Sequence, residues 1–286
     1  MRLLVTGGAG RLGSEVARLA ASAGHSVVAF DLPQVYWGSV DGLEGVEILP
    51  GDITDTGVVG EAVKRVEGVV HLAGLLPPRS EADRGLTMRV NVDGTRNIVE
   101  ALTRLLGVPL VFASTISTYG ITAEEEPSIG EGHAQRAHNN YSESKMEAER
   151  LIRGSGVPHT ILRIAPISIA DLVELPDVIP YRADQRVEFV YVEDAARAIL
   201  SSLQDPAARG EVLNIAGGRS WQMTGREYVE GFYGALGVEV EPVYSEDYTA
   251  VDWYDTSRSL FLGYQRLSFN GLQERLRVLG EQLGLR

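Results

Sequence analysis

A tyrosine and a lysine four residues apart form the spacing with the clearest chemical meaning. Tyr141 and Lys145 fall in a stretch predicted to be helical over residues 141–153, and side chains four residues apart share one face of a helix. A lysine ammonium near a phenol stabilises the phenolate and lowers the tyrosine pKa from about 10. Such a tyrosine takes a proton from a secondary alcohol or returns one to a ketone. Taken alone, this spacing is common on helices and indicates nothing.

A strand end supplies a third polar group. Residues 109–113 predict a buried strand that leads into Ser114 and Thr115. Open α/β sheets bind their ligands at the carboxyl ends of the strands. We therefore expect the Thr115 hydroxyl to orient the substrate oxygen beside Tyr141.

The start of the chain carries a pattern that holds phosphate. Residues 2–5 predict a buried strand, and Gly7, Gly10 and Gly13 follow it before a helical apolar face begins. Glycines at this spacing permit a tight turn and a close approach of the backbone to a pyrophosphate. The helix N-terminus directs its free N–H groups at the anion. Arg11 would touch the pyrophosphate, with a solvated helix arginine as the alternative.

An aspartate ends the second predicted strand. Residues 27–30 are apolar, and Asp31 follows them. In a dinucleotide-binding unit, an acid at this place accepts hydrogen bonds from the adenosine ribose and repels a 2′-phosphate. This position favours NAD over NADP, whereas the alternative is a solvated aspartate at a strand end.

Composition narrows the class of protein. The chain has 286 residues, no cysteine and a net charge of -13. The absence of cysteine excludes disulfides, thiolate metal sites and cysteine nucleophiles, and we expect no metal site, because His133 and His138 lack a ligand spacing. The charge argues against nucleic acid and anionic membranes as partners. Without a signal peptide or an apolar run of about 18 residues, a cytoplasmic protein is predicted.

The order of apolar segments predicts the fold. Strands and helices alternate through the first half of the chain, which is typical of a parallel sheet covered by helices on both faces. Strands are expected at residues 2–5, 27–30, 46–49, 69–74, 109–113, 159–164, 187–190 and 212–216. Helices are expected from Leu12 onward and at residues 55–66, 86–106, 141–153, 193–203, 224–236 and 267–283.

The predicted fold class is α/β, a Rossmann-type doubly wound parallel sheet with a small C-terminal substrate-binding lobe. Residues 1–165 would form the NAD-binding domain, to which residues 187–216 return. The lobe would comprise residues 166–186 and 217–286.

The ordered motifs together resemble the extended short-chain dehydrogenase/reductase family, which includes nucleotide-sugar epimerases and dehydratases. The motifs are Thr6–Gly13, Asp52-Ile53, His71–Gly74, Asn91, Ser114-Thr115 with Tyr119-Gly120, Tyr141 with Lys145, Phe189–Ala196 and Asp255–Tyr264. The resemblance implies that NAD is the cofactor and that Thr115, Tyr141 and Lys145 are catalytic. Its cofactor contacts would be Gly7, Gly10, Arg11, Leu12, Gly13, Asp31, Asp52, Ile53, Leu72, Ala73, Gly74, Asn91, Ser114, Tyr141 and Lys145. It also implies a homodimer that pairs the helices at residues 86–106 and 141–153.

Departures from the family pattern bear on the substrate. Family 4,6-dehydratases carry Asp-Glu after the active-site threonine, whereas Ile116 and Ser117 stand here, which disfavours a dehydratase. Pro166 replaces an asparagine that helps many relatives to hold a nucleotide sugar. Anion-binding candidates in segments expected to line the substrate cleft are Arg79, Arg182 and Arg186, with surface arginines as the alternative.

Three functions remain open from the sequence. The first is an NAD-dependent epimerase or oxidoreductase acting at a secondary alcohol or ketone of a sugar-like substrate, with Tyr141 as acid and base. The second is an NAD-dependent dehydrogenase or ketoreductase acting on a small non-nucleotide alcohol. A non-catalytic dinucleotide sensor is the third, and the Tyr141 and Lys145 pair disfavours it. The first two use the same residues, so the sequence does not separate them.

Overall fold

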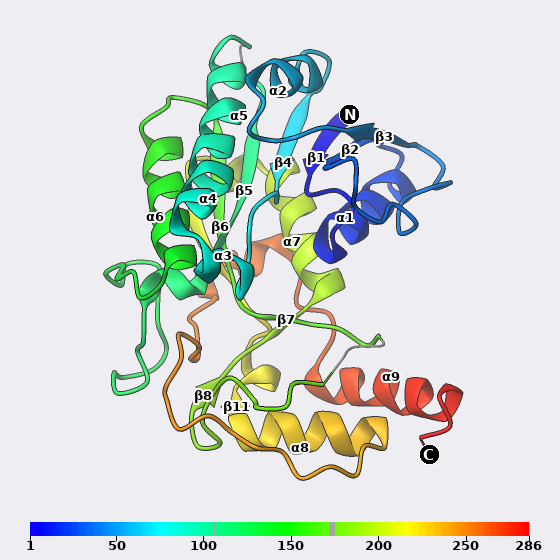
Figure 1. The fold of residues 1–286 in the computed structure, drawn as a ribbon, viewed down its shortest axis with the longest axis vertical. Helices are drawn as coiled ribbons and strands as arrows, with labels where there is room; N and C mark the ends of the chain where they lie inside the picture. The colour runs from blue at the N-terminus through cyan, green and yellow to red at the C-terminus, as the bar shows by residue number, and fades with distance from the viewer. Residues whose placement is uncertain (106, 172–174, 286) are drawn as a thin grey trace.

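The central element is a parallel sheet of seven strands in the order β10-β6-β5-β4-β1-β2-β3. A computed structural model describes residues 1–105, 107–171 and 175–285 of the chain (Figure 1). The strands are β1 (Arg2–Thr6), β2 (Ser26–Asp31), β3 (Val46–Pro50), β4 (Gly68–His71), β5 (Leu110–Thr115), β6 (His159–Ile164) and β10 (Val212–Ile215). The chain moves outward from β1 to β3 and then crosses back to β4, so the strand order reverses between β1 and β4. Such a switch point opens a crevice at the carboxyl ends of the strands.

Helices cover both faces of the sheet, as the alternation of segments predicts, and this confirms the fold class. Helices α1 (Arg11–Ser22) and α7 (Val192–Gln204) pack on one face, and α2 (Thr56–Val63), α5 (Gly94–Thr103) and α6 (Asn140–Arg153) pack on the other. None of the helices in the described part of the chain has both the length and the apolar character to cross a membrane.

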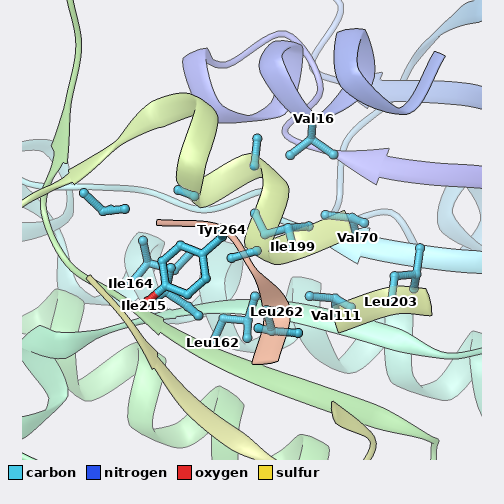
Figure 2. Packing of buried hydrophobic residues seen from close by; sticks show 14 of the residues in the cluster. Val16, Val70, Val111, Leu162, Ile164, Ile199, Leu203, Ile215, Leu262 and Tyr264 are labelled. Carbon is cyan, nitrogen blue, oxygen red and sulfur yellow. The ribbon is translucent and has the colours of Figure 1, made fainter. Parts of the chain in front are cut away.

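The period of two along each strand divides the core into two clusters. Leu3 and Val5 point toward α1 and α7, whereas Leu4 between them points toward the other helices. Figure 2 shows the first cluster, in which Val16 of α1 and Ile199 of α7 lie against side chains of the sheet.

The helix predicted over residues 86–106 contains a local change of winding. It begins as α4 (Arg84–Met88), passes through a π turn, η1 (Arg89–Asp93), and continues as α5 to Thr103. The predicted end at Leu106 lies outside the described residues. The loop before it, expected to be irregular, contains the short helix α3 (Arg79–Ala82). Widened turns of this kind occur frequently at functional sites.

A smaller lobe lies beyond the carboxyl ends of the strands, at the bottom of Figure 1. Helices α8 (Gly225–Leu236) and α9 (Phe269–Gln282) pack on the pair formed by β8 (Arg186–Val187) and β11 (Met223–Thr224). The strand expected at residues 187–190 is therefore wrong as a single element: β8 belongs to the lobe, and β9 (Val190–Tyr191) pairs with β7 (Ile167–Ser168). Between them, Glu188 is fully buried and accepts hydrogen bonds from the amides of Gly218 and Tyr254.

A buried ion pair joins α6 to the sheet. Glu149 of α6 and Arg163 of β6 are 0% and 3% exposed, and Arg163 Nε and Nη2 donate to the two carboxylate oxygens at 3.0 and 2.7 Å. Ser114 Oγ donates to the same carboxylate at 2.5 Å. Burial raises the pKa of Glu149, but hydrogen bonding and charge from Arg163 outweigh burial and hold that pKa below its usual range. The carboxylate therefore stays ionised and links α6, β5 and β6.

Replacing one member of this pair leaves the other as a buried charge. We expect Arg163→Met to lower the free energy of unfolding by about 3–5 kcal/mol, because Glu149 loses its main partner. The double variant Arg163→Met/Glu149→Leu removes both charges and should recover much of this loss. Urea unfolding of the three proteins measures the difference, and a double variant less stable than Arg163→Met would contradict the interpretation.

Candidate active site

A cavity of about 1140 Å³ opens at the carboxyl ends of the strands. Its lining includes most of the cofactor-binding and catalytic residues predicted from the sequence, and these come from segments far apart in the chain. They are Gly7, Gly10, Arg11, Leu12, Gly13, Asp31, Asp52, Ile53, Leu72, Ala73, Gly74, Arg79, Ser114, Thr115, Tyr141 and Lys145. The lining also includes residues that the sequence does not nominate, on the segment 164–169 and on α8.

The glycine turn is shaped to receive an anion. Gly7 has a φ of 70°, and a Cβ placed on Gly13 would lie 2.0 Å from the Gly7 carbonyl oxygen. No side chain can therefore stand at Gly13, and α1 starts directly against the turn. Gly10 is the N-cap and offers no side-chain cap, and the first turn of α1 carries no acid. The donors at this helix start remain directed outward, which fits a dinucleotide pyrophosphate.

Asp31 is held beside the glycine turn by the backbone. Its Oδ2 accepts from Ala9 N at 3.2 Å, and its Oδ1 accepts from Leu32 N at 2.8 Å. A carboxylate has about four acceptor positions, so both oxygens keep capacity for ligand hydroxyls. This arrangement fits a ribose diol.

A hydrogen-bonded histidine, His71 of β4, connects β1 and α5. The Thr95 hydroxyl donates to the Asn91 carbonyl oxygen at 2.6 Å, so it accepts from His71 Nε2 at 3.0 Å. The other ring nitrogen, Nδ1, must then accept from the Thr6 hydroxyl at 2.7 Å. Only the tautomer with the proton on Nε2 satisfies both hydrogen bonds of the ring.

The same hydrogen-bonded residues fix the backbone that lines the cavity. Thr6 Oγ1 accepts from the amides of Leu72 and Ala73, both at 3.2 Å. Burial lowers the pKa of His71 to about 3, and the nearby charge of Lys145 acts in the same direction. His71 is therefore a neutral structural link whose partners hold the end of β4 against the glycine turn.

Tyr141, Lys145 and Thr115 meet at one side of the cavity. Burial raises the pKa of Tyr141 to about 12, and a hydrogen bond with Thr115 partly opposes that rise. Burial lowers the pKa of Lys145 to about 8, against the opposing charge of Glu149. Lys145 Nζ donates to the Ala113 carbonyl oxygen at 2.8 Å and lies 5.9 Å from the centre of the Tyr141 ring.

These contacts correct the expected electrostatics of the pair. The sequence predicts that Lys145 lowers the pKa of Tyr141, but burial of the phenol dominates in this structure. The ammonium group lies over the Phe112 ring, 4.7 Å from its centre, and is engaged by a strand carbonyl. Tyr141 is therefore protonated at neutral pH here.

A glutamate that the sequence did not predict to be near the site holds the start of α6. Glu81 of α3 accepts from the backbone amides of Asn140 at 2.9 Å and Tyr141 at 3.2 Å. Nearby, Arg84 and Glu143 form a two-point ion pair at 2.9 and 2.6 Å. The loop after β4, with Arg79 on the cavity, is thus fastened to the start of α6. No local pattern could reveal this, because the partners lie about sixty residues apart.

Some nominated side chains are engaged elsewhere. Arg186 pairs at 2.6 Å with Asp252, which is fully buried, and Arg182 pairs at 2.8 Å with its neighbour Asp184. Neither arginine is among the residues that line the cavity. Asn91 is buried, and its side chain forms hydrogen bonds with Leu75 and Ser144 and is not part of the described cavity lining. Ser114 does line the cavity, but its hydroxyl is donated to Glu149.

Comparison with known proteins identifies the family. The model of the NAD dependent epimerase/dehydratase family matches residues 3–167, more than half of the chain. The chain belongs to this family. The matched residues include the glycine turn, Asp31, Tyr141 and Lys145. NAD is therefore the cofactor.

Individual relatives differ in activity. UDP-N-acetyl-alpha-D-glucosaminuronate decarboxylase of Bacillus cytotoxicus is 30% identical over 246 residues, which cover 75% of this chain and 74% of the relative. D-erythronate dehydrogenase of Cupriavidus necator is 32% identical over 183 residues, which cover 59% of this chain and 56% of that enzyme. UDP-glucose 4-epimerase of Thermus thermophilus, solved with NAD, has a TM-score of 0.83 at 24% identity, with 99% of both chains covered. This last similarity shows a shared fold.

No metal centre accompanies the cavity in the described chain. Among residues 1–105, 107–171 and 175–285, histidines and acids nowhere form a group of three or more that could hold a metal ion.

The neutral state of His71 has a consequence for stability. The unfolded chain protonates this ring below about pH 6.5, whereas the folded protein does so only near pH 3. Between these values the unfolded state binds more protons, so stability falls as the pH falls. We expect the stability advantage of the wild type over His71→Asn to shrink by about 1.4 kcal/mol per pH unit below about pH 6.5.

Urea unfolding of both proteins between pH 4.5 and 8 measures this difference. Because the other ionisable groups are common to both proteins, their effects cancel in the comparison. Parallel stability curves across the whole range would show that His71 is not the group responsible.

Proposed function

We propose that this protein is an NAD-dependent oxidoreductase of the epimerase type, acting at a secondary alcohol or ketone of a sugar-like substrate. The observation that carries the proposal is the meeting of Thr115, Tyr141 and Lys145 on the same cavity that the glycine turn lines. Membership of the family supports it, and so do the relatives that act on sugar nucleotides and on D-erythronate.

The cofactor fits the described residues. Gly7, Gly10 and Gly13 would hold the pyrophosphate, and Asp31 would accept from the ribose hydroxyls. Asp52 and Ile53 line the part of the cavity next to β2, where the adenine would lie. When bound, NAD supplies the hydride acceptor or donor and, in its oxidised form, a positive charge.

The chain supplies the proton chemistry. Tyr141 takes the proton from the substrate hydroxyl in oxidation and returns it to the ketone oxygen in reduction. Thr115, its hydrogen-bond partner, orients the same oxygen. Lys145 supplies positive charge on the neighbouring turn of α6 and thereby favours the phenolate.

A dehydratase does not fit this arrangement. The positions after Thr115 hold Ile116, which is 1% exposed, and Ser117, a neutral residue of the lining. Neither can serve as an acid or base for elimination.

The second candidate is a dehydrogenase acting on a small non-nucleotide alcohol. Pro166 favours it, because this proline lines the cavity where an amide side chain would hold a nucleotide.

We also propose a homodimer, as the family resemblance implies. The outward faces of α5 and α6 expose Arg96, Glu100 and Arg150 rather than apolar side chains. A pairing of these helices would therefore depend on opposite charges and weaken with salt. Light scattering at about 50 mM and 500 mM salt tests this, and a monomer at low salt would contradict it. The cytoplasmic location stays a prediction.

The central experiment compares the wild type with Tyr141→Phe. The purified protein is first tested for retained cofactor, and the affinities for NADH and NADPH are then measured, with at least about tenfold preference for NADH expected from Asp31. NADH formation with a panel of sugars and small alcohols follows. We expect Tyr141→Phe to lower kcat/KM by about 10²–10⁴-fold while NADH affinity is kept.

The pH dependence of the oxidation rate tests whether Lys145 lowers the kinetic pKa of Tyr141. Oxidation needs the phenolate, so its rate should rise with pH up to the pKa of Tyr141 in the loaded enzyme, and Lys145→Met should move that kinetic pKa upward. Retained cofactor without net NADH formation favours the epimerase, and free exchange with NADH formation favours the dehydrogenase. Full activity of Tyr141→Phe would reject both.

A further inference from the structure

The side of the cavity that faces the lobe differs in chemistry from the rest. The segment 164–169 and helix α8 contribute eight of the described lining residues, and these eight define the lobe-side wall. Six are apolar, namely Ile164, Ala165, Pro166, Ile167, Ile169 and Phe232. The other two are Ser168 and Tyr228. None of the eight is charged.

The two hydroxyls of this wall are partners of each other. Ser168 Oγ and Tyr228 OH lie 2.8 Å apart, and both side chains are buried. Tyr228 also stacks on Phe189, with ring centres 4.0 Å apart. The pair can offer one remaining donor to a ligand, which suits a single neutral oxygen better than a phosphate.

Three arginines on the lobe side of the cavity form ion pairs. Arg182 pairs with Asp184, Arg186 with the buried Asp252, and Arg226 with Glu230 at 3.3 Å. The cationic residues of the described lining are Arg11, Arg79 and Lys145, and all three lie outside the lobe-side wall.

The N-terminus of α8 is capped by the side chains of its own first turn. Thr224 caps α8 by accepting from Glu227 N, and the Glu227 carboxylate accepts from Thr224 N at 2.7 Å. A carboxylate therefore already occupies the positive end of this helix. A diphosphate placed against the lobe-side wall would meet no cationic residue among the described lining residues of that wall, and the start of α8 is already capped. Burying such a charge without a partner is costly.

We infer that the substrate presents an uncharged, apolar group, rather than a diphosphate, to the lobe-side wall. This inference rests on the proposed function and adds the class of substrate: a compact secondary alcohol or ketone, sugar-like at the reacting carbon, joined to an alkyl or aryl group.

A matched set of ligands tests the inference without catalysis. Glucose, galactose and glucuronic acid are each compared as the phenyl glycoside, the 1-phosphate and the UDP derivative, by titration calorimetry against the protein loaded with NADH. For at least one sugar, the phenyl glycoside should bind with a Kd at least about tenfold lower than the UDP derivative. Tighter binding of the UDP derivatives, or no binding of any phenyl glycoside, overturns the inference.

A variant of the wall provides the second readout. Ile169→Asn keeps the number of side-chain heavy atoms but makes the side chain polar, and it should weaken phenyl glycoside binding about tenfold while leaving NADH affinity unchanged. The matched control is Ile121→Asn, since Ile121 is 49% exposed and lies outside the described lining. Equal loss in both variants, or none in Ile169→Asn, overturns the inference. Tyr141→Phe tests the proposed function separately, because it should lower kcat/KM by about 10²–10⁴-fold while the glycosides still bind.

Discussion

The positions of Thr115, Tyr141 and Lys145 depend on one buried carboxylate. Glu149 sits one helical turn after Lys145 and accepts from Ser114, the neighbour of Thr115, and from Arg163 of the next strand. Gln135 and Arg153 donate to the same carboxylate at 3.0 and 2.7 Å. A buried charge tolerates little displacement from its donors, because each lost hydrogen bond leaves charge unsatisfied. The geometry of α6 against β5, and hence of Tyr141 against Thr115, follows from this constraint.

The two sides of the cavity are built differently. The cofactor side is made by strand ends and glycines, where the backbone itself supplies the donors and Thr6 and His71 hold it in place. The lobe-side wall is made by side chains from α8 and from the segment after β6. Backbone geometry constrains the first strongly, since a Cβ at Gly13 has no room. Side chains alone decide the chemistry of the second, so it can change without disturbing the sheet.

This difference explains what could be predicted from the sequence. The seven strands of the central sheet, the glycine turn and the helix that carries Tyr141 and Lys145 follow from local periodicity and are found as expected. The role of Glu81 could not be predicted, because it depends on loop and helix segments far apart in sequence. The pairing of Arg186 with Asp252 likewise joins residues sixty-six positions apart, and that pairing removes Arg186 from the cavity. Local patterns cannot show which partner an arginine finds.

The electrostatics of the pair show why the environment must be considered together with the motif. Lys145 is buried and Tyr141 is half-buried, and desolvation favours the neutral form of each: it raises the pKa of the phenol to about 12 and lowers the pKa of the ammonium to about 8. Spacing alone suggests a lysine that activates a tyrosine, yet desolvation opposes that activation. At neutral pH the tyrosine is therefore a proton donor in this site. In the proposed reaction it would act as a base only once added positive charge outweighs burial, so proton removal would depend on the loading of the cavity.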